Sequence, residues 1–206
     1  MEEKYVHNVY DSISDNFNNT RAYVWKSIKN FILQLKENSL ILDCGCGNGK
    51  NMEINKKCYF IGFDYSINLL KICKNKNLNI LQSNIKKIPF KDEIFDATIS
   101  VAVLHHIYFK SDRSDAINEL IRVTKKNGEI LIQVWSNDVK KNKKFTKINN
   151  NNDYFVSWYV NKNLSLNRYY HLFTNKELID LIPNDKVYIK DIYDEMENIV
   201  LILVKK

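Results

Sequence analysis

The chain has 206 residues, of which 45% are hydrophobic, and its formal net charge is +7. This content is enough to bury a substantial core without disulfides, so we predict one domain over residues 1–206. The four cysteines form no C-x-x-C pair, no hydrophobic run approaches the roughly 20 residues of a membrane span, and the start lacks the basic-then-apolar order of a signal peptide. We therefore expect reduced thiols, no metal, no membrane association, and a location in the cytoplasm or the nucleus.

The net charge bears on the partners of the chain. Each lysine or arginine near a phosphate releases a counterion, so a phosphate-rich partner such as a nucleic acid would be attracted. A lysine-rich solvated surface explains the same charge equally well. Composition alone therefore permits nucleic-acid binding without requiring it.

The N-terminal part of the chain has the spacing of amphipathic helices. Hydrophobic side chains recur three and four residues apart from Val6 to Phe17, and again from Ile28 to Leu35. This spacing predicts two helices before the first strand, within a helical N-terminal extension over residues 1–36.

Strand-like and helical segments alternate through the rest of the chain. Residues 66–75 and 114–123 have helical spacing. Hydrophobic runs predict seven strands, over residues 40–44, 58–63, 79–82, 95–101, 129–135, 186–193 and 199–204. This alternation predicts a doubly wound, Rossmann-like α/β fold with a parallel sheet and helices on both of its faces.

Two local features modify this picture. Only residues 194–198 join the last two strands, which is too short for a crossover, so the last strand should be antiparallel in a mostly parallel, seven-stranded sheet. Residues 140–152 are rich in lysine and asparagine and have almost no hydrophobic anchors. This composition predicts a flexible loop.

Three of the five glycines lie in one segment, Asp43-Cys44-Gly45-Cys46-Gly47-Asn48-Gly49, directly after the first predicted strand. Glycine is needed where the backbone takes positive φ or approaches a ligand closely, and a strand-to-helix turn of this kind presents free N–H groups. The second strand leads into Asp64, about twenty residues beyond the turn, where a carboxylate can accept hydrogen bonds from both ribose hydroxyls. The two features together predict a nucleoside cofactor site.

The spacing of this motif favours S-adenosylmethionine over a dinucleotide. It reads D-x-G-x-G-x-G, whereas the dinucleotide fingerprint is G-x-G-x-x-G, whose glycines let a pyrophosphate sit on the helix. S-adenosylmethionine has no pyrophosphate but carries an ammonium group, which Asp43 and the loop carbonyls can receive. Ligands of this fold bind beyond the carboxyl ends of the strands, so residues 102–106 should face the transferring methyl group.

Family similarity is carried by several further segments. Residues 81–90 resemble the adenine-contacting loop of class I S-adenosylmethionine-dependent methyltransferases, with Asn84 where the family usually has aspartate. Within that superfamily the chain resembles the eukaryotic tRNA carboxymethyluridine methyltransferases in residues 5–13, 19–21, 99–106, 133–135, 153–156 and 168–173. Together with the glycine motif, this similarity leads us to expect a cofactor pocket formed by Asp43, Gly45, Cys46, Gly47, Asn48, Gly49, Asp64, Tyr65, Asn84, Ile85, Val101 and Ala102.

The resemblance implies an enzyme that esterifies the carboxymethyl group of the modified wobble uridine, in the tRNA anticodon stem-loop. It also implies a small zinc-binding activator subunit as partner. A carboxylate is already an anion at neutral pH, so this reaction needs alignment and desolvation more than a general base. Candidates for orienting the carboxylate or a phosphate are Arg21, His105, His106, Arg168 and His171. Candidates for contacting the substrate are Arg21, Trp135, Tyr154 and Arg168.

Other interpretations remain open at this point. Arg21 and Arg168 could form surface ion pairs, the histidine pair could be structural, and Trp135 and Tyr154 could pack in the core. The same cofactor site would serve a methyltransferase of a small acid or amine, or a non-catalytic scaffold that binds the cofactor. A dehydrogenase is disfavoured by the glycine spacing.

Overall fold

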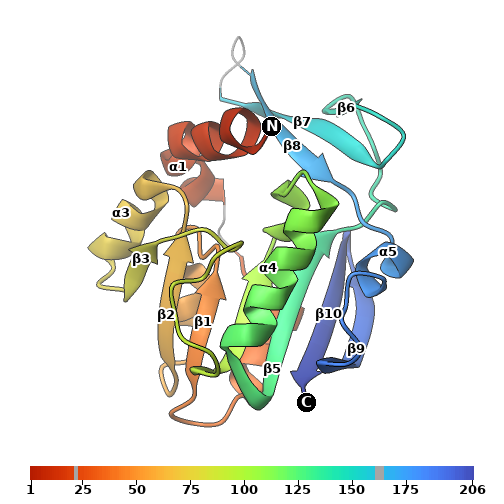
Figure 1. Ribbon diagram of the computed structural model, residues 1–206. Coiled ribbons are helices and arrows are strands. Elements are labelled where there is room, and N and C mark those ends of the chain that lie inside the picture. Colours follow the sequence, from red (N-terminus) through yellow and green to blue (C-terminus); the bar gives the residue numbers. More distant parts are fainter. Residues whose placement is uncertain (21–22, 161–164) are drawn as a thin grey trace.

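A seven-stranded sheet in the order β3-β2-β1-β4-β5-β10-β9 forms the centre of the molecule (Figure 1). The computed structural model describes residues 1–20, 23–160 and 165–206. β1 to β5 pair in parallel wherever they are neighbours, whereas β10 is antiparallel to both β5 and β9. The strands are β1 (Leu40–Cys44), β2 (Tyr59–Asp64), β3 (Ile80–Gln82), β4 (Phe95–Val101), β5 (Thr124–Trp135), β9 (Val187–Glu195) and β10 (Asn198–Lys205). The predicted α/β fold, with its antiparallel last strand, is confirmed.

Helices cover both faces of this sheet, because alternate residues of the central strands point to opposite sides. Leu42 packs in the cluster that contains Ile117 and Leu120 of α4 (Lys110–Val123). Its neighbour Ile41 packs in the other cluster, with Ile28 of α2 (Lys26–Gln34). Full burial of each such side chain contributes about 1.5–3 kcal/mol, so these two clusters hold the sheet between its helices.

The remaining helices are short or lie near the carboxyl ends of the strands. Ser66 caps α3 by accepting a hydrogen bond from Leu69 N at 3.2 Å, and Thr174 caps α5 in the same way through Glu177 N. These elements are the π-helix η1 (Glu3–His7), α1 (Asn8–Thr20), α3 (Ile67–Asn75), α5 (Asn175–Ile179) and the 3₁₀ turns η2 (Lys50–Glu53) and η3 (Leu104–His106). No helix in the described part of the chain is long and apolar enough to cross a membrane.

A second, three-stranded antiparallel sheet was not predicted. It consists of β6 (Phe145–Lys147), β7 (Asp153–Tyr159) and β8 (Ser165–His171). β6 lies within residues 140–152, which we expected to be a loop, and its three residues are too few to give a hydrophobic pattern. Figure 1 shows this sheet beside α1, above the carboxyl ends of the main strands. The small sheet therefore forms a cap over the end of the main sheet where ligands of such folds bind.

One strand boundary also differs from the prediction. β5 begins at Thr124 and not at residue 129. The added residues Lys125, Lys126 and Asn127 are exposed and lie between the paired residues Thr124 and Glu129, so no hydrophobic pattern marks this part of the strand.

Candidate active site

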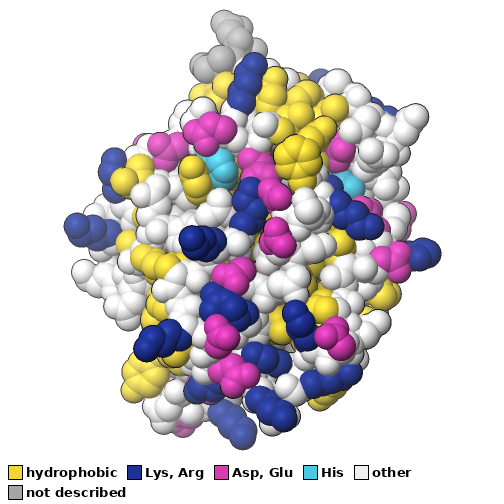
Figure 2. Space-filling model, viewed as in Figure 1, with side chains coloured by type: hydrophobic (Ala, Val, Ile, Leu, Met, Phe, Trp, Pro, Cys, Tyr) yellow, Lys and Arg dark blue, Asp and Glu magenta, His cyan; other side chains and the backbone are white. Residues whose placement is uncertain are grey.

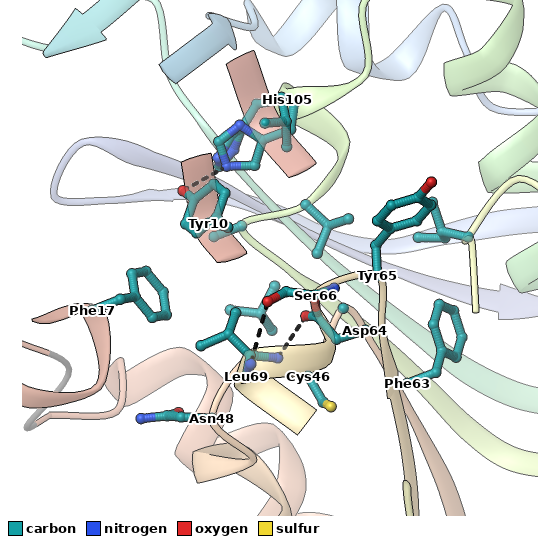
Figure 3. Close-up of a pocket in the computed structure, with 18 of the residues that line it drawn as sticks. Tyr10, Phe17, Cys46, Asn48, Phe63, Asp64, Tyr65, Ser66, Leu69 and His105 are labelled. Atoms are coloured by element: carbon teal, nitrogen blue, oxygen red, sulfur yellow. Dashed lines mark hydrogen bonds between the residues drawn. The ribbon is translucent and has the colours of Figure 1, made fainter. Parts of the chain in front are cut away.

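A pocket opens at the carboxyl ends of β1, β2 and β4, beneath α1 and the small sheet (Figure 3). Its wall contains most of the residues expected to hold the cofactor, namely Gly45, Cys46, Gly47, Asn48, Asp64, Tyr65, Asn84, Ile85, Val101 and Ala102. Asp43 and Gly49 are not part of the wall. Gly49 instead precedes η2 at φ 75° and packs toward Leu78 and Cys73. Ten of the twelve residues expected to hold the cofactor therefore line one pocket.

The glycine loop is held close to its neighbours by backbone hydrogen bonds. The N–H groups of Gly45 and Cys46 both donate to the carbonyl of Phe63, each at 2.8 Å. Gly45 has φ +80°, and a Cβ at this position would lie 2.4 Å from Cγ2 of Val103. Only glycine accommodates both the backbone conformation and this close approach.

Asp64 faces the pocket from the end of β2. Its two carboxylate oxygens accept hydrogen bonds from Gly47 N and Ser66 N, both at 2.9 Å. Burial raises the pKa of Asp64, whereas these backbone hydrogen bonds lower it. Each carboxylate oxygen has two lone pairs, so the carboxylate can still accept bonds from a diol.

Asp43 lies beneath the glycine loop, fully buried in β1. Burial raises its pKa to about 7, against a smaller opposing effect of Asn51. Neither carboxylate oxygen has a well-formed hydrogen bond within the described part of the chain. We expected Asp43 to contact the ammonium group of the ligand directly. Because Asp43 is fully buried and does not line the pocket, this geometry does not provide such a contact. An uncompensated carboxylate under the loop nevertheless favours a positively charged ligand above it.

The end of β4 has an unusual backbone conformation. Ala102 has φ +60°, which is uncommon for a residue with a side chain, and its N–H donates to the carbonyl of Gln133 at 3.0 Å. Strained residues of this kind cluster at functional sites. Ala102 turns the chain from β4 into η3, which brings His105 and His106 to the pocket.

The hydrogen bonds of these histidines assign their protons. His106 Nδ1 lies 2.8 Å from the carbonyl of Tyr169, which can only accept, so Nδ1 carries the proton and Nε2 accepts from the Tyr10 hydroxyl at 2.9 Å. His105 Nδ1 accepts from Trp135 N at 3.3 Å, which leaves the proton on Nε2. His105 thus presents a donor, and the lone pair of His106 is engaged by Tyr10.

Tyr10 of α1 joins several polar groups at the pocket wall. Besides His106, its hydroxyl lies 3.3 Å from the Tyr170 hydroxyl and accepts from Arg168 Nη1 at 3.3 Å. Arg168 itself lies behind the wall, 5% exposed, with its guanidinium 4.8 Å from the ring centre of Trp158. None of the ion pairs in the described part of the chain involves Arg168. The surface ion pair considered for Arg168 is therefore wrong.

Two other candidate residues lie away from the pocket. His171 is buried, and its ring nitrogens lie 2.8 Å from Asp153 Oδ1 and 2.7 Å from Glu177 Oε1. Tyr154 is buried within the small sheet, in the cluster that contains Phe145. Direct contact of His171 or Tyr154 with the reacting groups does not fit these positions, because neither side chain lines the pocket.

Of the other candidates for contacting the substrate, Trp135 lies at the pocket, whereas the position of Arg21 is not described. Trp135 lines the pocket, with its ring centre 4.7 Å from that of Tyr170. Arg21 lies outside the described residues.

The N-terminal extension contributes residues that the sequence motifs did not single out. Tyr10, Phe17 and His7 all line the pocket, and the His7 ring stacks on that of Tyr65 at 3.6 Å. Three hydrogen bonds hold the N-terminal helices against the rest of the chain. Asp11 accepts from Ser66 Oγ at 2.8 Å, and Asn18 accepts from Asn48 Nδ2 at 2.8 Å. Glu2 accepts from Lys86 Nζ at 3.2 Å. The family-like segment at residues 5–13 was the signal that could have identified His7 and Tyr10, whereas Phe17 lies outside it.

Comparison with known proteins identifies the family. Residues 42–132 match the model of a methyltransferase domain. The chain is 31% identical over 200 residues to the tRNA (carboxymethyluridine(34)-5-O)-methyltransferase of Schizosaccharomyces pombe, covering 88% of this chain and 87% of the relative. The chain belongs to the tRNA carboxymethyluridine methyltransferase family. S-adenosylmethionine is the cofactor of this class, as the sequence predicted.

Other relatives of this chain are longer. The chain is 44% identical over 147 residues to the tRNA (carboxymethyluridine(34)-5-O)-methyltransferase of Arabidopsis thaliana and 42% identical over 145 residues to that of Xenopus tropicalis. These matches cover 71% and 69% of this chain, but only 36% and 23% of the relatives. The chain thus spans about a third of the length of the first and a quarter of the second.

Solved structures with the same fold have low sequence identity to this chain. A methyltransferase solved in a complex with the Haloferax volcanii Trm112 methyltransferase activator has a TM-score of 0.75 and 12% identity, with 97% of each chain covered. An S-adenosylmethionine-dependent methyltransferase from Clostridium acetobutylicum has a TM-score of 0.72 and 14% identity, with 96% of each chain covered. These comparisons show a shared fold.

The residues of the pocket fit S-adenosylmethionine. Gly45 and Gly47 both have positive φ, and Gly45 leaves no room for a side chain where the loop approaches Val103. Asp64 provides acceptors for a ribose. Asn84 Oδ1 already accepts from Lys86 N at 2.9 Å, and its second lone pair can accept from an adenine amino group.

Proposed function

We propose that this chain transfers a methyl group from S-adenosylmethionine to the carboxylate of carboxymethyluridine at the wobble position of tRNA. One observation carries the proposal: the glycine loop and Asp64 form one side of a single pocket, and Tyr10, His105 and His106 form the other. Figure 3 shows Tyr10 and His105 across the pocket from Cys46 and Asp64. The names of the relatives in Schizosaccharomyces pombe and Arabidopsis thaliana support this substrate.

The cofactor side of the pocket follows from the residues present. Gly45, Gly47 and Asp64 would hold the nucleoside and Asn84 its base, while the buried charge of Asp43 favours the cationic methionine end. When bound, S-adenosylmethionine supplies an electrophilic methyl group on a sulfonium centre. Because the sulfonium and the substrate carboxylate neutralise each other as the methyl group moves, a pocket that excludes water favours the reaction.

The substrate side of the pocket would bind and orient the carboxylate. One carboxylate oxygen forms the bond to the methyl carbon as the carbon–sulfur bond breaks, and no proton has to move. The Nε2–H of His105 can donate to the other oxygen, whereas the single proton of the Tyr10 hydroxyl is donated to His106 Nε2, so Tyr10 would hold this side of the pocket in place. Neither histidine is placed as a general base, because the lone pair of each is engaged, by Trp135 N or by Tyr10.

Arg168 would act through Tyr10. Its guanidinium donates to the Tyr10 hydroxyl at 3.3 Å, and within the described part of the chain no carboxylate pairs with it. A buried positive charge behind the wall favours an anion in front of it. Trp135, which also lines the pocket, would stack on the uracil ring.

The activator subunit is a further part of this proposal. The structural neighbour solved with the Trm112 methyltransferase activator supports it. We also propose that the chain acts in the cytoplasm, with the nucleus as a second location.

Substrate preference tests the proposal. The chain, alone and with the activator, is incubated with S-adenosylmethionine and with tRNA carrying the free acid, the free carboxymethyluridine nucleoside, or simple carboxylic acids. We expect methylation of the tRNA at a kcat/KM far above that of the others. Equal activity on simple acids would assign the chain to small-molecule methylation instead.

A further inference from the structure

Residues 137–147 carry a dense positive charge on the small sheet. Within this stretch there are five lysines and a single acidic residue, Asp138. All five lysines are exposed. We call this set, Lys140, Lys141, Lys143, Lys144 and Lys147, the lysine segment.

The lysine segment has no acidic partners within the described part of the chain. Seven lysines elsewhere form ion pairs, including Lys86 with Asp112 at 2.7 Å and Lys125 with Asp96 at 2.7 Å. Figure 2 shows basic and acidic side chains interspersed on the face that carries α4. The lysines of the lysine segment form no ion pairs within the described residues, so their positive charge is available to an anionic partner.

The aromatic side chains beneath the lysine segment connect it to the pocket. Lys141 Nζ lies 5.6 Å from the ring centre of Tyr154. The Tyr154 ring contacts that of Phe145 on β6 at 6.2 Å, and Phe145 lies 6.1 Å from Trp135. Trp135 lines the pocket. Only a few rings therefore separate the pocket wall from the exposed lysines.

We propose that the lysine segment binds the phosphate backbone of the RNA whose modified base occupies the pocket. The inference rests on the proposed function, because it takes the target base to be part of a polynucleotide. Lysine ammonium groups contact phosphates without reading sequence, so the segment contributes affinity and orientation and does not select the base. It acts on binding of the nucleic acid and not on the methyl group.

Charge reversal tests the lysine segment. Lys143→Glu/Lys147→Glu changes two exposed side chains for which the described structure shows no hydrogen bond, ion pair or ring contact, so we expect folding to be retained. The matched control is Lys36→Glu/Lys56→Glu, which changes the net charge equally at exposed positions beside the amino ends of β1 and β2. The measurement is the dissociation constant for unmodified tRNA transcript across a salt series, with cofactor affinity measured in parallel.

We expect the variant in the lysine segment to bind tRNA about tenfold more weakly at low salt. The slope of log affinity against log salt should become shallower by about 0.7 to 0.9 for each phosphate that the variant no longer neutralises. The control should bind like the wild type, and cofactor affinity should be the same in all three proteins. Unchanged tRNA binding by the variant, or an equal weakening in the control, would overturn the proposal.

Binding and methylation separate this inference from the proposed function. If the wild type bound tRNA through the lysine segment but never methylated the wobble uridine, the proposed function would fail and the surface would stand. If methylation occurred and Lys143→Glu/Lys147→Glu left both KM for tRNA and the dissociation constant unchanged, the surface would fail and the proposed function would stand.

Discussion

The Tyr10 hydroxyl lies 2.9 Å from Nε2 of His106, although 96 residues separate the two in sequence. Tyr10 belongs to the N-terminal helix α1, and His106 follows the central strand β4. Because Nδ1 of His106 donates to the backbone of β8, this histidine ties the N-terminal extension, the main sheet and the small sheet together at the pocket. The extension is therefore part of the active site and not an appendage to the fold.

Removing the Tyr10 hydroxyl should impair the substrate side of the pocket alone. Tyr10→Phe deletes the group that contacts His106, Tyr170 and Arg168. We expect kcat/KM for tRNA to fall roughly 10- to 100-fold, since about 1.4 kcal/mol corresponds to each factor of ten. Calorimetry should give unchanged affinity for S-adenosylmethionine. Tyr188→Phe, at an exposed position on β9, is the control, and equal activity of Tyr10→Phe and the wild type would exclude the role.

Gly45→Ala should weaken cofactor binding. The new Cβ would lie 2.4 Å from Val103 Cγ2, and the backbone at φ +80° disfavours alanine. We expect at least a tenfold decrease in affinity for S-adenosylmethionine in a calorimetric titration, beyond any decrease in Val103→Ala. The double variant Gly45→Ala/Val103→Ala removes the steric clash but not the backbone cost, so it should recover only part of the affinity. Wild-type affinity in Gly45→Ala would contradict the placement of the loop.

Asp43 should make the unliganded protein less stable as the pH rises. Its ordinary pKa of 3.8 is raised to about 7 by burial, so the folded state holds a proton that the unfolded state releases between pH 4 and 7. Stability is lost over that window, and Asp43→Asn should be more stable than the wild type at pH 8, by roughly 1 to 3 kcal/mol in urea unfolding. Asp185→Asn, at an exposed position, should show no such difference.

The Asp43 carboxylate should affect cofactor affinity with the opposite dependence on pH. A cationic ligand favours ionised Asp43, so affinity for S-adenosylmethionine should rise as the pH increases through about 7. In Asp43→Asn the affinity should be weaker and independent of pH in this range. A wild-type affinity that falls as the pH rises would refute this electrostatic role.

His171 should be important for stability and not for the methyl transfer itself. Both of its ring nitrogens face carboxylates, an arrangement that is satisfied when both nitrogens carry protons. Although burial alone would raise the pKa of Asp153, the hydrogen bonds from Tyr169 and His171 lower it, and His171 likewise lowers the pKa of Glu177. Stability from these depressed acids is present at neutral pH and is lost as the pH falls below about 4.

His171→Asn should therefore reduce the free energy of unfolding at pH 7 by roughly 3 kcal/mol, because it leaves buried carboxylates without their partner. Affinity for S-adenosylmethionine should be unchanged, since His171 does not line the pocket. Chemical denaturation and calorimetry measure the two quantities. A fully stable but inactive His171→Asn would instead restore a direct catalytic role.

The main sheet and the cofactor loop could be predicted because their determinants are local. Hydrophobic runs mark strands that are buried on both faces, and the glycines with Asp64 form a motif of fixed spacing. The small sheet could not be predicted, since β7 and β8 mix buried and exposed side chains and β6 has three residues. Their burial depends on rings from distant elements, such as Trp135 against Tyr170.

The roles of charged residues were harder to predict for a similar reason. Arg168 and His171 stand three residues apart in the chain, and we expected the same role for both. In the structure Arg168 is enclosed by aromatic rings and contacts Tyr10, whereas His171 is bonded to Asp153 and Glu177. Tertiary contacts that involve α1 and α5 determine this difference, and no local pattern encodes them.

The central claim is that the methyl group is transferred to a carboxylate oxygen of the wobble uridine. The direct measurement is mass spectrometry of nucleosides from tRNA carrying the free acid, after incubation with the chain, the activator and deuterium-labelled S-adenosylmethionine. The account predicts one labelled methyl group on the carboxymethyluridine at position 34, released as methanol by mild alkali because it is an ester. A labelled methyl group that resists alkali, or that lies on another nucleoside, would contradict it.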